Sequence, residues 1–127
     1  MNYPGRARSR LASFRYAFSG WWYVLRTQRN AWIHVAASLA VIAAGLLFGL
    51  DLLEWAILLL AIALVWLAEF FNTALEAVVD LASPQLHPLG RVGKDVGAAA
   101  VLIAAGTAGL IGLLILGPYL LAVFSPG

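Results

Sequence analysis

The sequence contains no cysteine and few charged residues. The absence of cysteine excludes disulfide bonds and thiolate-ligated zinc sites, and it leaves the redox compartment open. Only 11% of the 127 residues are Asp, Glu, Lys or Arg, whereas 63% are hydrophobic and the mean hydropathy is +0.91. In a soluble domain about a quarter of the residues would be charged. The composition therefore predicts an integral membrane protein made of a single domain, residues 1–127.

The basic residues are concentrated in the N-terminal quarter. Six arginines lie there: Arg6, Arg8, Arg10, Arg15, Arg26 and Arg29. No apolar stretch precedes them, so we expect no removed signal peptide. In so apolar a chain, anionic lipid headgroups are better partners for these arginines than nucleic acid, and we expect no nucleic-acid partner.

The same N-terminal region has a helical hydrophobic period. The recurring residues are Leu11, Phe14, Phe18, Trp21 or Trp22, and Leu25. Steps of three and four residues, with arginines between them, predict an amphipathic helix over about residues 6–28 that lies in the membrane interface. Its role is open between a simple membrane anchor and a cover over a cytoplasmic site.

Three long apolar segments follow, at about residues 31–50, 53–82 and 96–124. Each reaches the ~20 residues that a helix needs to cross the bilayer. Arginines precede the first segment, and Arg91 and Lys94 lie between the second and third. The positive-inside rule then places the N-terminus and the loop 83–94 in the cytoplasm and the C-terminus outside. The expected fold is an all-α membrane protein with an N-terminal amphipathic surface helix plus three transmembrane helices.

Polar residues interrupt the second apolar segment near its cytoplasmic end: Glu69, Asn72, Glu76 and Asp80. At 100° per residue, the three acids fall within about 40° of one another, and the asparagine lies about 60° to one side. A helix of about 30 residues is about 45 Å long, which exceeds the ~30 Å hydrocarbon core, so this end should reach the headgroup layer. Acids at membrane depth normally serve a function. The alternative is a cation path or a polar network that only sets helix packing.

The start of the third segment is a second candidate site. We expect Gly93, Lys94 and Asp95 to open this helix, where free backbone N–H groups favour a phosphate. The alternative is a lysine that reaches toward lipid phosphates. These residues do not form a nucleotide-binding phosphate loop, because Pro88 occupies the position of a required glycine and no Ser or Thr follows the lysine. Small residues later in the segment indicate close helix packing.

These groups together suggest phosphoryl transfer to a lipid. Carboxylates at a membrane surface can hold Mg²⁺, which prefers oxygen ligands and commonly bridges phosphates. A carboxylate can also take the proton from a lipid hydroxyl. A lysine can stabilise the transferring phosphoryl group.

Two motifs carry a family resemblance: the stripe Glu69-x-x-Asn72-x-x-x-Glu76-x-x-x-Asp80, and His87 followed by Lys94-Asp95. Over about residues 14–105 the chain resembles the small prokaryotic diacylglycerol kinase/undecaprenol kinase family. The resemblance implies an ATP-dependent, Mg²⁺-requiring homotrimer of the cytoplasmic (inner) membrane. It also implies active sites that are shared between neighbouring subunits.

The resemblance further implies roles for single residues. Glu69 would be the general base on the lipid hydroxyl, and Glu76 would hold the metal bound to ATP. The phosphate and nucleotide contacts would fall to Asn72, Asp80, His87, Lys94 and Asp95. The family has a further glutamate, a second metal ligand, at the end of the surface helix. Gln28 stands there in this sequence and would be a weak ligand, because an amide oxygen brings no charge.

The stretch from Arg29-Asn30 to Ile33-His34 resembles the undecaprenol kinase branch. Undecaprenol is therefore the expected substrate, and diacylglycerol is the alternative. An interpretation from a different class is a non-enzymatic membrane oligomer with a cation-binding or structural role. A kinase relative inactivated at Gln28 is a further alternative.

Overall fold

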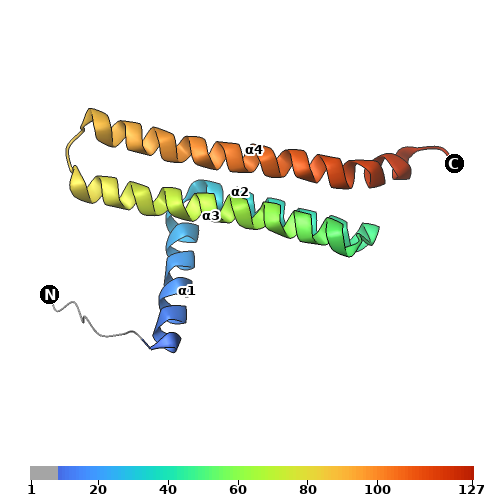
Figure 1. Ribbon diagram of the computed structural model, residues 1–127, viewed down its shortest axis with the longest axis horizontal. Helices are drawn as coiled ribbons and strands as arrows, with labels where there is room; N and C mark the ends of the chain where they lie inside the picture. The colour runs from blue at the N-terminus through green and yellow to red at the C-terminus, as the bar shows by residue number, and fades with distance from the viewer. Residues whose placement is uncertain (1–8) are drawn as a thin grey trace.

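The computed structural model describes residues 9–127 as four helices joined by short turns (Figure 1). The helices are α1 (Arg10–Thr27), α2 (Arg29–Phe48), α3 (Leu52–Ala82) and α4 (Pro88–Phe124). No strand occurs within these residues, and α2, α3 and α4 are each long and apolar enough to cross a membrane. The expectation of an all-α membrane protein with one amphipathic helix and three spanning helices is confirmed.

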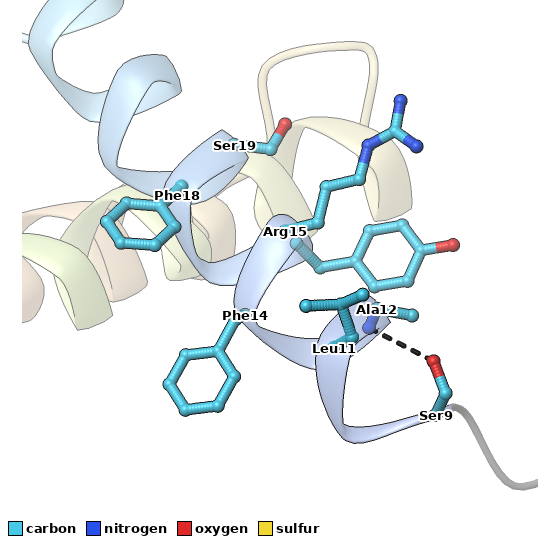
Figure 2. A pocket seen from close by; sticks show the side chains of 8 residues that line it. Ser9, Leu11, Ala12, Phe14, Arg15, Phe18 and Ser19 are labelled. Atoms are coloured by element: carbon cyan, nitrogen blue, oxygen red, sulfur yellow. Dashed lines mark hydrogen bonds between the residues drawn. The ribbon is translucent and has the colours of Figure 1, made fainter.

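α1 is a short helix with two unlike faces. Its N-cap is Ser9, whose Oγ accepts a hydrogen bond from the backbone N–H of Ala12 at 3.2 Å (Figure 2). Figure 2 shows Phe14 and Phe18 projecting on one side of the helix and Arg15 on the other. Both phenylalanines are exposed in the chain, as an interfacial helix requires if its apolar face is to enter the lipid.

The direction of α1 also agrees with an interfacial helix. α2, α3 and α4 run alongside one another, whereas α1 crosses them steeply (Figure 1). A helix that crosses the spanning helices in this way lies along the membrane surface when they cross the bilayer. The observed bounds, Arg10–Thr27, fall inside the expected 6–28, and residues 6–8 lie outside the described part of the chain.

The turn between α2 and α3 is specified by local sequence. α2 ends at Gly49, whose φ of 67° is the left-handed conformation that glycine tolerates best. Asp51 then caps α3, because its side chain accepts from the backbone N–H of Glu54 at 2.8 Å and the Glu54 side chain accepts from the Asp51 N–H. The hydroxyl of Tyr119 donates to Glu54 at 2.7 Å. This bond joins the start of α3 to the C-terminal part of α4.

α3 and α4 pack along their length and make the most extensive contact between helices in the described chain (Figure 1). Leu50, Leu58 and Leu116 form a buried apolar cluster near the turn between α2 and α3. Most other large apolar side chains are exposed, such as Leu47 at 84% and Leu102 at 74%. Such exposure suits helices whose outer faces contact lipid.

The start of α4 corrects one expectation. The helix begins at Pro88, with His87 as its N-cap, and not near the start of the apolar segment at 96. Proline suits the first helical position, because its missing N–H would have had no partner there. Gly93, Lys94 and Asp95 therefore lie in the second turn, and the prediction that they open the helix is wrong. Lys94 can offer a phosphate its ammonium group, but not the free N–H groups of a helix N-terminus.

Candidate functional site

The polar stripe on α3 passes from a buried interior to an exposed end. Glu69 is 2% exposed and Asn72 is 9% exposed. Glu76 is half-buried, and the Asp80 side chain is 65% exposed. One helix face thus carries an acid in an apolar interior and, three turns later, an acid in water.

Gln28 joins this stripe from the junction of α1 and α2. Its side-chain Nε2 donates to Glu76 Oε2 at 3.4 Å, and Asn72 Nδ2 donates to Glu76 Oε1 at 3.3 Å. Two amides therefore converge on one carboxylate. This contact brings the end of the surface helix to the acid stripe.

The asparagine is held by close approach of α4. Asn72 Oδ1 is buried without a hydrogen-bond partner, and a Cβ added at Gly97 would lie 2.3 Å from it. Only a residue without a side chain leaves room for the Asn72 amide. The sequence pattern indicated packing for the small residues of this segment, and it gave no sign that Gly97 makes space for a site residue.

His34 is a functional candidate that belongs to neither of the two sequence motifs. Its Nε2 lies 3.4 Å from Glu69 Oε2, and the two side chains are 12% and 3% exposed. One signal was available, because His34 is the single titratable residue of the first apolar segment and such residues usually mark function. The partner on α3 could not be read from that signal.

The remaining predicted site residues lie where α3 ends and α4 begins. Lys94 Nζ and Asp80 Oδ1 form an ion pair at 2.5 Å between α4 and α3. Asp95 pairs loosely with Arg91 one turn earlier, at 3.9 Å, on exposed surface. His87 caps α4, with Nδ1 accepting from the Leu89 N–H at 3.1 Å. The structure thus joins Lys94 to the stripe, whereas Asp95 and His87 make only local contacts.

An aromatic layer covers the buried part of the stripe. Trp21 of α1 packs against Phe70 with centroids 4.5 Å apart and against Trp66 at 4.9 Å. Trp66 Nε1 donates to Ser38 Oγ on α2 at 3.1 Å. The C-terminal half of α1 therefore covers α3, while Phe14 in its N-terminal half remains free to anchor in lipid.

An apolar groove begins at His34 and runs between α2 and α4 over α3. Its volume is about 430 Å³. The lining includes His34, Val41, Leu58, Val65, Gly109 and Leu116. On the α4 side the groove is lined by small residues such as Ala105, Ala108, Gly109 and Gly112. His34, which also lines it, lies 3.4 Å from Glu69.

The residues around Glu76 fit Mg²⁺ only together with a phosphate ligand. Within residues 9–127 no three His, Asp or Glu side chains converge on a point that could hold a metal ion. Rotating both amides beside Glu76 would present oxygen in place of nitrogen, giving one carboxylate and two neutral oxygen ligands. Mg²⁺ is commonly held by one or two carboxylates and by substrate phosphates. This donor set therefore matches a metal that arrives with a nucleotide.

The chemistry available at the site follows from the change in exposure along the polar stripe, from buried Glu69 to exposed Asp80. Glu69 can receive a proton inside the apolar region, Glu76 can help hold a metal at the boundary, and Lys94 can contact phosphate in water. These groups lie along one face of the helix pair α3 and α4. The arrangement suits a reaction between a membrane-embedded hydroxyl and a soluble phosphate donor.

Comparison with known proteins agrees with this chemistry. A family model described as prokaryotic diacylglycerol kinase matches residues 15–116. A diacylglycerol kinase of Synechocystis sp. is 46% identical over 114 residues, which cover 89% of this chain and 65% of that protein. The undecaprenol kinase of Bacillus subtilis is 43% identical over 108 residues, which cover 85% of this chain and 88% of that protein. A diacylglycerol kinase of Escherichia coli is 39% identical over 90 residues, or 65% of this chain and 73% of the relative.

The matched residues 15–116 contain α2, α3, most of α1 and α4, and every residue of the polar stripe. The chain belongs to the prokaryotic diacylglycerol kinase family.

Proposed function

We propose that this protein is a lipid kinase that transfers the γ-phosphoryl group of ATP, with Mg²⁺, to the hydroxyl of a membrane lipid alcohol. The observation that carries the proposal is the position of Glu69. This carboxylate is 2% exposed and lies 3.4 Å from His34, which lines an apolar groove, while Glu76, Asp80 and Lys94 follow toward the exposed end of the stripe. A base in this place can reach a hydroxyl at the lipid boundary, and the phosphate donor can approach from the aqueous end.

In this proposal, Glu69 removes the hydroxyl proton as the lipid oxygen attacks the γ-phosphorus. Asn72 and Lys94 contact the phosphates, and Glu76 with Gln28 holds the metal. Bound Mg²⁺ would neutralise charge on the phosphate oxygens during transfer. The nucleotide site would be completed by Asp80, His87 and Asp95.

The structure supports these roles unequally. Five of the proposed groups make direct contacts, three of them in the Gln28–Glu76–Asn72 network and two in the Lys94–Asp80 pair. His87 and Asp95 lack such contacts, and their roles rest on family resemblance alone.

Undecaprenol is the proposed lipid. The named relatives include both an undecaprenol kinase and diacylglycerol kinases, so similarity alone does not choose between them. The stretch from Arg29-Asn30 to Ile33-His34 resembles the undecaprenol kinase branch, and this resemblance supports undecaprenol. Diacylglycerol, which has two chains, is the second candidate.

The proposed assembly is a homotrimer in the cytoplasmic membrane, with the N-terminus and the turn 83–87 on the cytoplasmic side. One chain leaves the groove and the face of α4 open, and small residues on that face suit close helix packing.

The direct test is a radiolabelled-ATP assay with the purified protein and a panel of lipid alcohols. Mg²⁺-dependent label transfer to undecaprenol, in excess of transfer to diacylglycerol, supports the full proposal. Greater transfer to diacylglycerol corrects the lipid. Cation flux through vesicles without ATP turnover would instead support the non-enzymatic alternative.

A further inference from the structure

Among residues 9–127, the titratable side chain in contact with the buried carboxylate of Glu69 is His34. The atoms Nε2 and Oε2 lie 3.4 Å apart, and Nε2 is sealed from solvent without a hydrogen-bond partner. An ionised carboxylate in an apolar interior is costly unless a partner or a proton offsets its charge. His34 is placed to supply either.

The other charged groups near this level are engaged elsewhere. On α3, Glu76 accepts hydrogen bonds from Gln28 and Asn72. On α4, Lys94 pairs with Asp80, and Arg91 pairs with Asp95. α1 contributes the ring of Trp21, packed on Trp66, which in turn makes an edge contact with His34 at 6.0 Å.

We infer that His34 and Glu69 act as one proton-sharing pair, in which His34 takes on the proton that Glu69 removes from the lipid. The inference rests on the proposed kinase function and assigns a role that the polar stripe does not contain. His34 acts through Glu69, not on the lipid itself.

The proton balance of the step is complete. The lipid oxygen forms a bond to the γ-phosphorus of ATP, the bond from that phosphorus to the β–γ bridging oxygen breaks, and ADP leaves. The hydroxyl proton moves to the Glu69 carboxylate and then to His34 Nε2. The resulting imidazolium can then release the proton on its other ring nitrogen, Nδ1, because the His34 side chain lines the groove and is the more exposed of the two.

The first experiment does not depend on turnover. The chain contains two histidines, so the ring signals of ¹⁵N-histidine-labelled protein can be followed separately by NMR during a pH titration. In E69Q the His34 midpoint should move, because the carboxylate that lies 3.4 Å from Nε2 becomes an amide that cannot share a proton. The His87 midpoint should not move, because His87 contacts the α4 N-terminus. An unmoved His34 midpoint in folded E69Q overturns the inference.

The second experiment measures kcat against pH for H34Q. Glutamine retains a hydrogen-bonding group but cannot accept a proton, so kcat should fall at least about tenfold and the acidic limb should change position. Thr107→Val, a change of an exposed polar residue on α4, should leave both unchanged. A uniform loss of kcat at every pH would mean that His34 only shapes the site. Absence of lipid-dependent ATP turnover in the wild type would contradict the kinase proposal, while the NMR comparison still decides whether the pair exists.

Discussion

Gln28 Nε2 donates to Glu76 Oε2 at 3.4 Å, and this bond joins the end of the surface helix to the polar stripe of α3. The contact spans 48 positions of sequence. It makes the residue that departs from the family pattern a direct neighbour of the proposed metal ligand, so the effect of that departure can be measured.

The first prediction concerns Gln28→Glu. The change places two carboxylates together, which repel without metal and attract a divalent ion between them. Opposite charges about 4 Å apart attract by about 4 kcal/mol at an effective dielectric constant of about 20, before desolvation costs. We expect a lower Tm without Mg²⁺, a larger rise of Tm on adding Mg²⁺ with nucleotide, and half-maximal lipid phosphorylation at lower Mg²⁺.

The matched control is Gln85→Glu, at an exposed position in the turn before α4. It adds the same charge away from Glu76 and should leave the Mg²⁺ titration unchanged. Equal titrations for the wild type and Gln28→Glu would show that Gln28 is not at the metal. Activity in Gln28→Glu alone would identify the natural chain as an inactivated relative.

The second prediction is that Glu69→Gln removes the general base. The amide keeps the shape of the side chain but cannot take a proton, so lipid phosphorylation should fall at least about 10²-fold. The comparison is Glu54→Gln. Glu54 lies in the first turn of α3, where it accepts hydrogen bonds from the Asp51 N–H and the Tyr119 hydroxyl. That variant should lose stability and retain kcat. Near-normal turnover by folded Glu69→Gln would reject Glu69 as the base.

The third prediction concerns Gly97→Ala. The new methyl group would lie 2.3 Å from Asn72 Oδ1, so the amide must move or the helices must separate. Overpacking of this kind costs about 1–3 kcal/mol, and a displaced Asn72 would also lose its bond to Glu76. We expect a lower Tm and a clear loss of kcat. Gly106→Ala is the matched control, because a Cβ at Gly106 meets nothing within 4 Å. Equal effects of the two changes would argue against the Asn72 contact.

The fourth prediction tests whether the sites are shared between subunits. Glu69 and Lys94 lie on different helices, and each has its own partner: Glu69 lies 3.4 Å from His34, and Lys94 forms an ion pair with Asp80. If one site uses Glu69 of one subunit and Lys94 of another, oligomers mixed from Glu69→Gln and Lys94→Ala chains should regain part of the wild-type activity. Each variant alone should remain inactive. Verified mixed oligomers without activity would indicate that each chain builds its own site.

Most of the helical architecture follows from sequence patterns. Apolar length predicted the three spanning helices, and the 3.6-residue period predicted both α1 and the shared face of Glu69, Glu76 and Asp80. These are local properties, because a helix orients its own side chains whatever packs against it. The start of α4 was predicted too late in the sequence, because hydropathy indicates where lipid contact begins. The helix itself starts earlier, among polar residues, with His87 as its N-cap and Pro88 as its first residue.

The contacts between helices were decided by the tertiary structure. Sequence patterns placed Gln28, His34 and Gly97 in three separate segments, and only packing brought each of them to a residue of the α3 stripe. The physical reason is that helix period determines which face a side chain occupies but contains no information about the rotation, height and crossing angle of the neighbouring helix. The acids themselves were therefore predictable from sequence, whereas the partners that neutralise, orient and confine them were visible only in the fold.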